Sequence, residues 1–255
     1  MIGMINNLGV MIGLSAMARH SKEVNTSLER LATGKKINRA SDDPAGMVAS
    51  ESMETRLRVL SKKIDGLIFE DKRTGAIEGA QSALFDLVEE LNGLVVGSAN
   101  GARITAKERE ANQVQVNSVL EAIDHIAGTT TFNGEKILEY LDSRHLGLEK
   151  LREGGEQNVV SGDLERAQQT VQGAIDSLQV QQEGLAIHAK DINSQINTAR
   201  TEFENLSAAK SQIVDTDYAE EMSKYVRASV LRDAAAFMTG MAMKENAHLI
   251  QVLLG

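Results

Sequence analysis

The strongest constraint on the fold is an apolar heptad repeat that runs through residues 164–213. Steps of alternately four and three residues from Leu164 meet fifteen positions, and twelve of these are apolar. The apolar positions are Leu164, Val171, Ile175, Leu178, Leu185, Ala189, Ile192, Ile196, Ala199, Phe203, Leu206 and Ile213. Seven unbroken heptads make a rod of roughly 75 Å at about 1.5 Å per residue. The repeat therefore predicts one very long helix, which needs long partner helices along its length.

Partner helices are predicted in the first half of the sequence. Apolar residues recur at helical spacing at Leu57, Leu60, Ile64 and Leu67, and then at Ile77, Leu84, Val88, Leu91 and Val95. Asp43 suits the N-cap of this segment, and Pro44 suits its first helical position. Residues 97–101 form a Gly- and Ser-containing break, after which a further helix begins near Ala106. The pattern predicts a mainly α fold, a long antiparallel helical bundle or coiled coil whose longest helix comes last.

The periodicity changes between the two halves. Residues 129–134, TTTFNG, place β-branched residues before Asn-Gly, which is the strongest short-range signal for a hairpin. A second turn-rich patch follows at residues 154–155 and 161–163. The sequence therefore predicts a small β element around residues 129–163 that caps the bundle.

Composition excludes several classes of function. The 255 residues include no cysteine and no tryptophan, so a disulfide, a thiol nucleophile and a thiolate zinc site are all excluded. The net charge is −9, and aromatic residues make up only 3%. A nucleic-acid binder needs a basic stripe and stacking aromatics, and both are sparse here. No uninterrupted run of about 18 apolar residues exists, so no membrane span is expected.

No catalytic, cofactor-binding or metal site is predicted. A phosphate loop ending at Gly34-Lys35 would need glycine at position 29 and Ser or Thr at position 36, where the sequence has Glu29 and Lys36. Residues 215–221 lack the glycine that a calcium loop requires at its sixth position. The five histidines lie at least twenty residues apart, without metal-ligand spacing. An enzyme is therefore the weak hypothesis, and no cofactor is expected.

Both ends of the chain carry apolar stripes at helical spacing. The residues predicted to form a self-assembly surface are Ile5, Leu8, Met11, Ile12, Val24, Leu28, Leu31, Met222, Val226, Val230, Ala234, Phe237, Met241, Leu249 and Leu253. Ends of soluble monomers usually trail off polar, so these stripes are expected to be buried between paired N- and C-terminal helices and against neighbouring molecules. The sequence thus predicts a discontinuous terminal-helix core domain at residues 1–40 and 215–255, and a bundle domain at residues 41–214.

Residues 27–46, SLERLATGKKINRASDDPAG, are predicted to join these two domains. Gly34 permits a positive φ, and Pro44, the single proline of the chain, restarts a helix. The residues assigned to this inter-domain joint are Gly34, Lys35, Asn38, Asp42, Asp43 and Pro44.

The same stretch resembles the N-terminal signature of bacterial flagellins. Three further segments resemble that family in the same order, namely residues 131–134 (TFNG), 204–209 (ENLSAA) and 215–222 (DTDYAEEM). Together they span nearly the whole chain. Only some thirty residues separate the hairpin from Leu164, so the resemblance implies a minimal flagellin without variable outer domains.

The resemblance implies a structural subunit that self-assembles into the extracellular filament of the bacterial flagellum, for swimming motility. The expected partners are further copies of the chain in a helical homopolymer, a flagellar export chaperone, and the cap and hook-associated proteins. Export would follow the flagellar type III pathway without a cleaved signal. This expectation fits the N-terminus, which has no basic residue before its apolar part.

Two alternatives remain at this point. The hook–filament junction protein of the flagellum also suits Asp42-Asp43-Pro44 and the Met-rich residues 238–243. A coiled-coil adaptor or export chaperone, which binds a partner's helix through the same stripes, belongs to a different class. Fibres in electron micrographs of the purified protein would favour a filament subunit, and discrete particles would favour an adaptor.

Overall fold

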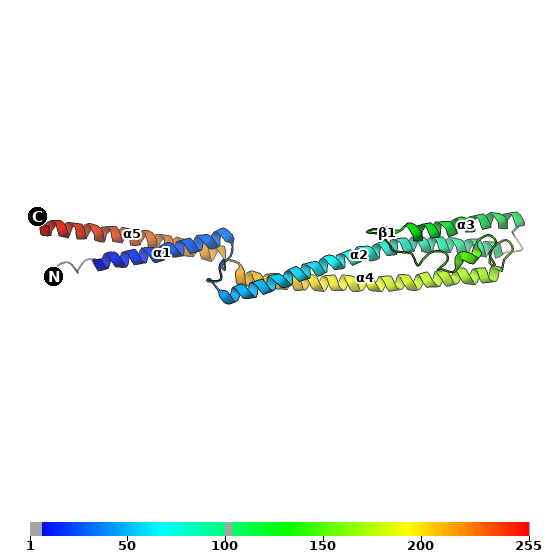
Figure 1. The fold of residues 1–255 in the computed structure, drawn as a ribbon, viewed down its shortest axis with the longest axis horizontal. Helices are drawn as coiled ribbons and strands as arrows, with labels where there is room; N and C mark the ends of the chain where they lie inside the picture. Colours follow the sequence, from blue (N-terminus) through cyan, green and yellow to red (C-terminus); the bar gives the residue numbers. More distant parts are fainter. Residues whose placement is uncertain (1–6, 100–103, 255) are drawn as a thin grey trace. The chain divides into compact units, whose positions relative to one another are not determined.

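The computed structural model describes residues 7–99 and 104–254, and it divides into two compact units. We call residues Met1–Leu60 with Glu202–Gly255 the terminal unit, and Ser61–Thr201 the bundle unit. Two long helices, α2 (Pro44–Ala99) and α4 (Leu164–Val214), contribute to both units (Figure 1). The predicted fold class, long helices with a small hairpin, is confirmed. The functional division at residues 40 and 215 stays a prediction.

The helix boundaries follow the local sequence signals. α4 covers the whole heptad repeat, and Gln168 is the only one of its fifteen seam positions that is exposed. α2 begins at Pro44, where the Asp43 carboxylate accepts a hydrogen bond from the Gly46 N–H at 2.9 Å. α3 (Ala106–Thr129) begins with a capping box, in which Thr105 and Glu108 satisfy each other's backbone N–H groups. α2 ends at Ala99, within the predicted break, and residues 100–103 lie outside the described chain.

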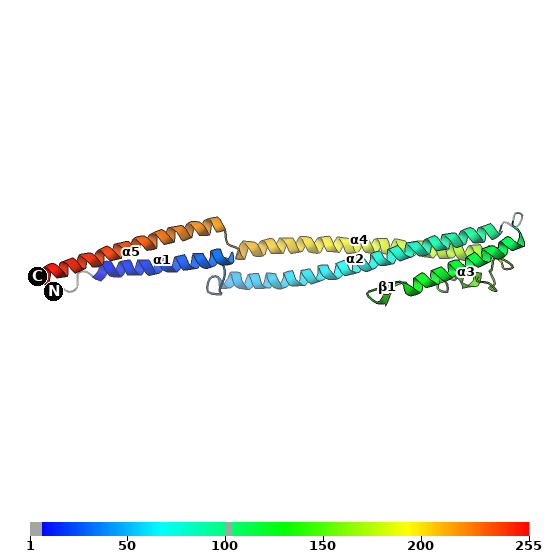
Figure 2. The ribbon, with the colours of Figure 1, turned by 90° about the horizontal axis from the view of Figure 1, so that it is seen from above.

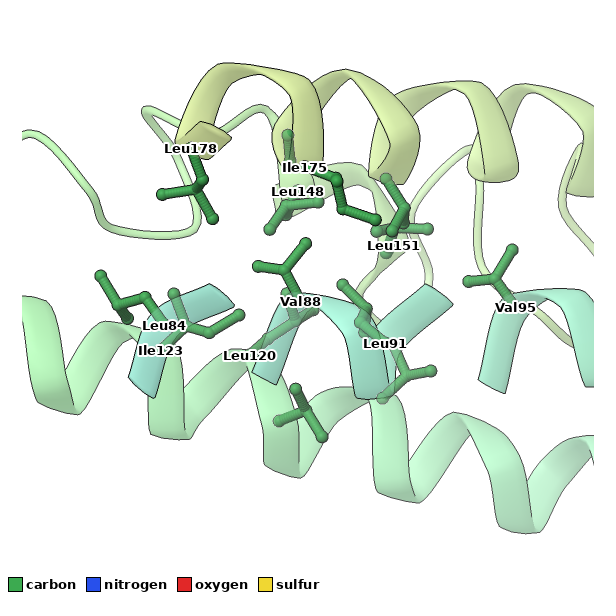
Figure 3. Packing of buried hydrophobic residues seen from close by; sticks show 14 of the residues in the cluster. Leu84, Val88, Leu91, Val95, Leu120, Ile123, Leu148, Leu151, Ile175 and Leu178 are labelled. Atoms are coloured by element: carbon green, nitrogen blue, oxygen red, sulfur yellow. The ribbon is translucent and has the colours of Figure 1, made fainter. Parts of the chain in front are cut away.

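The bundle unit has a hydrophobic core made by α2, α3, α4 and the irregular segment 137–163. Apolar side chains from the three helices point toward one another in this core (Figure 3). Its buried members are Leu84, Val88, Leu91, Val95, Val116, Val119, Leu120, Ile123, Leu138, Leu141, Leu148, Leu151, Val159, Ala167, Val171, Ala174, Ile175 and Leu178. Most of them are fully buried, so this cluster is packed within the bundle unit itself.

The predicted hairpin is present but short. β1 (Thr131–Phe132) and β2 (Glu135–Lys136) are antiparallel and are joined by Asn133 and Gly134, both with positive φ. Positive φ at both central residues is the geometry for which Asn-Gly is preferred in a two-residue turn. The Phe132 ring lies against Phe69 of α2 with centroids 5.1 Å apart. This contact fastens the hairpin to the bundle.

The rest of the region after the hairpin forms no strand among the described residues, which limits the predicted β element to residues 131–136. Residues 137–163 instead run as turns around one short 3-10 helix, η1 (Leu148–Leu151). This segment forms no strand because its buried leucines are irregularly spaced, whereas the buried residues of a strand alternate with exposed ones. The second turn-rich patch ends at Asp163, whose carboxylate accepts from the Arg166 N–H at the start of α4.

Polar side chains of α3 hold this irregular segment in place. The Asp124 carboxylate accepts hydrogen bonds from the Ser143 N–H and hydroxyl, at 2.8 and 3.0 Å, and pairs with Arg152. Buried Gln113 donates to the Leu151 carbonyl at 2.9 Å and accepts from the Val159 N–H at 2.8 Å. A segment without regular structure is thereby given partners for its buried backbone groups.

The terminal unit is built on α1 (Asn7–Thr33) and α5 (Tyr218–Leu254). Figures 1 and 2 both show the two helices side by side and antiparallel. The short connections from α1 to α2 and from α4 to α5 meet beside them, in the segments 34–43 and 215–217. This unit contains every residue assigned to self-assembly and to the joint.

Candidate self-assembly surface and joint

The seam between α1 and α5 combines apolar residues of α1 with mainly small or polar residues of α5. A set of buried and half-buried residues recurs every three to four positions along each helix. On α1 this set is Val10, Gly13, Met17, His20, Val24, Ser27 and Leu31. On α5 it is Glu221, Tyr225, Ala228, Arg232, Ala235, Thr239 and Ala242. Both sets keep the heptad spacing of a two-helix coiled coil, and the large aliphatic members all come from α1.

The helices approach closely at Gly13. A Cβ atom placed on this glycine would lie 2.2 Å from the Thr239 hydroxyl oxygen and 3.2 Å from the Thr239 Cβ. The Thr239 hydroxyl donates to the Ala235 carbonyl at 2.7 Å, so its hydrogen bond is made within α5. Glycine at position 13 therefore provides the space into which Thr239 fits.

Most of the predicted self-assembly residues face away from the seam and are exposed. The exposed ones are Leu8, Met11, Ile12, Leu28, Met222, Val226, Val230, Ala234, Phe237 and Met241. Leu14, Leu231, Met238 and Met243 are further exposed apolar residues on the same two helices. We call the exposed Leu, Ile, Val, Met and Phe side chains of α1 and α5 the outer apolar face.

A few of the predicted residues do not belong to the outer apolar face. Val24 is buried and Leu31 is half-buried, and both lie at seam positions. Ile5 lies outside the described residues, and the side chains of Leu249 and Leu253 lie outside the described part of α5. The assignment of all fifteen residues to self-assembly stays a prediction.

Sequence reasoning missed the small and polar residues of the seam. Gly13, Ser27, Glu221, Ala228 and Thr239 pair the two helices, although none of them belongs to an apolar stripe. Their heptad spacing was the available signal. A search restricted to large apolar residues passes over it, because most of the large apolar residues of these helices lie on a different face.

The joint consists of two connecting segments, one after α1 and one before α5, which are held together by backbone hydrogen bonds. Lys35 and Asp215 form an antiparallel bridge, with the Lys36 N–H donating to the Val214 carbonyl at 2.7 Å and the Thr216 N–H donating to the Gly34 carbonyl at 2.9 Å. Gly34 has φ of 70°, and a Cβ there would lie 3.0 Å from the Tyr218 hydroxyl. The structure thus brings the predicted joint residues Gly34 and Lys35 against a second connection, at residues 214–216.

The Asp42 carboxylate holds the second half of the joint in place through hydrogen bonds to the backbone. The Asp42 carboxylate accepts from the Asn38 N–H at 3.0 Å and from the Arg39 N–H at 2.9 Å, and these two bonds lower the pKa of Asp42 below its ordinary 3.8. The Asn38 side chain donates to the Lys35 carbonyl at 2.8 Å, and Ile37 is buried between these polar groups. The joint is consequently a defined turn structure instead of a loose linker.

An ion pair ties the first turns of α2 to α4 within the terminal unit. The Lys210 ammonium lies 3.0 Å from the Glu54 carboxylate, which also pairs with Arg58 at 2.6 Å. The hydrogen bonds from Arg58 and Lys210 lower the pKa of Glu54 to about 2. This carboxylate therefore stays ionised at any physiological pH.

The part of the chain that the structure describes offers little for catalysis. Within residues 7–99 and 104–254, no three His, Asp or Glu side chains are grouped so that they could hold a metal ion. No described helix is both long and apolar enough to cross a membrane. What the arrangement provides is a large apolar surface on paired helices.

Two family models match the sequence. The bacterial flagellin N-terminal helical region matches residues 5–142, and the bacterial flagellin C-terminal helical region matches residues 168–253. Between them the two matches include α1, α2, α3 and the hairpin on one side, and nearly all of α4 and α5 on the other.

Individual proteins are similar over almost their whole length. The chain is 26% identical to the flagellar filament 33 kDa core protein of Treponema phagedenis, over 97% of the chain and 98% of that protein. It is 26% identical to a flagellin of Halalkalibacterium halodurans and 23% identical to a flagellin of Bacillus subtilis, with the same coverage.

Proposed function

The chain belongs to the bacterial flagellin family and is a structural subunit of the extracellular flagellar filament, and we propose that it assembles by burying the outer apolar face of α1 and α5 against other copies. The observation that carries the proposal is the exposure of this face. Phe237, Val230 and Leu8 are all more than half exposed on helices that already pair with each other along a different face. A single copy has no further element among the described residues to cover them.

Burial of this face supplies the driving force. Covering a Val, Leu, Ile, Phe or Met side chain that is two-thirds exposed contributes roughly 1–2 kcal/mol. Six side chains of the outer apolar face are at least 60% exposed and the others are 42–53% exposed, and we propose that their combined burial offsets the entropy of fixing the subunit. No covalent chemistry is required, and we accordingly propose that the protein is not an enzyme.

The geometry of the contacts decides the form of the assembly. The outer apolar face extends along both helices and differs in sequence between α1 and α5, so one copy presents unlike surfaces to its neighbours. Unlike surfaces make heterologous contacts, which produce an open helical fibre when the rotation does not close. This form suits a filament subunit.

The proposed partners follow from the same surface. Before assembly the outer apolar face would be exposed to water, and this supports the proposal that an export chaperone binds it. We propose that the chain is exported by the flagellar type III pathway. The cap and the hook-associated proteins would meet the same face at the two ends of the filament. The matched relatives are named flagellins and filament core proteins, which favours a filament subunit over the hook–filament junction protein or an adaptor.

Truncation tests whether the terminal helices carry assembly. A chain without residues 1–30, or without residues 230–255, is expected to stay helical and monomeric, because the bundle core lies wholly in residues 84–178. Electron microscopy after a salt jump checks for fibres, and circular dichroism checks the helical content. Long filaments from either truncated chain would contradict the proposal.

A matched pair of substitutions tests the outer apolar face itself. Val230 on α5 and Val114 on α3 are 61% and 68% exposed, so serine at either position should alter the fold of the monomer very little. We expect Val230→Ser to raise the critical concentration for assembly roughly tenfold, since about 1.4 kcal/mol of burial is lost per subunit. Val114→Ser serves as the control and should leave the critical concentration unchanged. If Val230→Ser and Val114→Ser changed the critical concentration equally, the outer apolar face would not be the surface that drives assembly.

A further inference from the structure

Glu221 is unusual among the buried residues. It is 4% exposed, and among the buried residues that the structure describes it is the only Asp, Glu, Lys or Arg. It lies on the seam of α5, where the other fully buried positions are Ala228 and Thr239. An isolated carboxylate in such a place is strongly unfavourable, so its surroundings must compensate its charge.

Partners from both helices provide this compensation. The Ser27 hydroxyl of α1 donates to the Glu221 carboxylate at 2.6 Å, and the Arg30 guanidinium of α1 lies 3.6 Å from its second oxygen. Lys224, one turn further along α5, lies 3.7 Å from the same oxygen. Two of the three partners thus come from the opposite helix, and they depend on how the helices are aligned.

One half of the α5 seam specifies alignment weakly. Small residues recur there at Ala228, Ala235 and Ala242, each seven residues from the next. A slide of one heptad would replace one of these alanines by another, although it would also take Thr239 away from Gly13. The alanines therefore leave the alignment to the contacts that a slide destroys.

We infer that Glu221 is a register-determining residue of the α1–α5 pair. Sliding α5 by one heptad toward the N-terminus of α1 would move Glu221 from Ser27 to His20, and would put Glu23 where Arg30 had been. The buried carboxylate would then face another carboxylate in place of a guanidinium. Sliding the other way would place Glu221 beside Gly34, beyond the end of α1 at Thr33, and would put Ile37 where Arg30 had been.

This role adds to the proposed function. Its consequence for assembly rests on that proposed function. The outer apolar face has members on both helices, so its continuity depends on their alignment. A pair that slipped by one heptad would displace the apolar residues of α5 by about 10 Å along those of α1. Neighbouring copies would then meet an interrupted surface.

Cysteine cross-linking measures the alignment directly, because the natural chain contains no cysteine. Gly13→Cys with Thr239→Cys reports the described register, since the Cβ positions lie 3.2 Å apart and the typical disulfide separation is about 3.5–4.5 Å. Gly13→Cys with Arg232→Cys reports the register in which α5 has slid one heptad toward the N-terminus of α1. In the described register these two positions are about 10 Å apart along the helix axis, too far to be bridged.

The test compares the yields of the two cross-links in the dilute, full-length protein under mild oxidation. With Glu221 present, we expect the in-register cross-link to exceed the slipped one more than about tenfold, and Glu221→Leu to bring the two within about twofold. Glu221→Gln keeps the size of the side chain and its bond from Ser27 but loses the charge, so its ratio should fall between. Glu220→Gln is the matched control, because Glu220 also pairs with Lys224, at 2.7 Å, yet is exposed. Its ratio should equal that of the parent.

Two results would overturn the inference. The ratio could stay unchanged in both Glu221→Gln and Glu221→Leu, which would mean that the backbone bridge at Lys35 and Asp215 sets the register alone. The in-register cross-link could also be absent from the parent. Because the ratio is measured without filaments, its failure is distinguishable from failure of the assembly surface, which Val230→Ser tests.

Discussion

The bundle unit and the α1–α5 pair distribute the same kinds of residue in opposite ways. In the bundle unit, leucine and valine side chains fill the interior, as in Figure 3. In the α1–α5 pair, the α5 side of the seam is small and polar, while most of the large apolar residues of both helices point outward. The bundle unit is thus stabilised by burial within the chain, whereas the proposed assembly would bury the outer apolar face between chains.

The number of packed elements explains the contrast. Three helices and the segment 137–163 enclose a volume in which a side chain can be surrounded on all sides. Two helices share only one seam, so residues on their other faces remain in water whatever their chemistry. The close approach at Gly13 brings α1 and α5 together, and the proposed assembly would bury their exposed apolar residues against other copies.

The largest expected effect comes from truncating core leucines. Leu120 of α3 is 0% exposed and Leu8 of α1 is 68% exposed. Leu120→Ala should lower the free energy of unfolding by about 3–5 kcal/mol, because it removes buried methyl groups and leaves a cavity. Leu8→Ala should change it by less than about 0.5 kcal/mol. Urea denaturation followed by circular dichroism measures both, and similar losses would break the comparison between the two regions.

The next effect concerns the close approach at Gly13. Alanine there should destabilise the α1–α5 pair by about 1–3 kcal/mol, because the new Cβ overlaps Thr239. Gly9 has open space around its Cβ position, so Gly9→Ala should stabilise α1 by roughly 0.5–1 kcal/mol through helix propensity. Hydrogen exchange of α1 amides measures these changes. Stabilisation by both substitutions would show that the seam is looser than described.

A smaller effect is expected at the start of α3. Thr105→Ala removes the side-chain half of the capping box and should lower the free energy of unfolding of the bundle unit by about 1 kcal/mol. Thermal unfolding followed by circular dichroism provides the measurement. Thr105→Ser keeps the hydroxyl and should retain most of the stability, so an equal loss in the serine variant would contradict capping as the cause.

The smallest effect is the pH dependence of the Glu54 ion pair. Its pKa in the folded chain, about 2, lies below the ordinary 4.5, so the pair stabilises the terminal unit fully above pH 4.5. That contribution should fade as the pH falls from 4.5 toward 2. The difference between the urea midpoints of the natural chain and of Glu54→Gln should therefore decrease as the pH falls from 4.5 to 2.

Glu51→Gln removes an exposed carboxylate one turn earlier on α2 and is the control for this titration. The midpoint difference that it causes should show no comparable narrowing between pH 4.5 and 2. A gap for Glu54→Gln that widened as the pH fell would mean that the sign of the linkage is wrong. High salt should also reduce the Glu54 effect, because the pair is exposed to solvent.

The sequence by itself determined the features that depend on local chemistry and periodicity. The heptad repeat of α4, the start of α2 at Pro44 and the Asn-Gly hairpin could all be predicted, because each follows from spacing or backbone preference within a few residues. The apolar stripes of the chain ends could be read in the same way.

Only the tertiary structure decided which faces meet. The pairing of Gly13 with Thr239 and of Ser27 with Glu221 joins residues about two hundred positions apart, and no periodicity within one helix ranks a small-residue face above an apolar one. The same holds for the leucines of η1, whose burial depends on Asp124 and Gln113 of α3 holding an irregular segment in place. Helix formation is local, whereas the choice of partner face depends on close packing between distant parts of the chain.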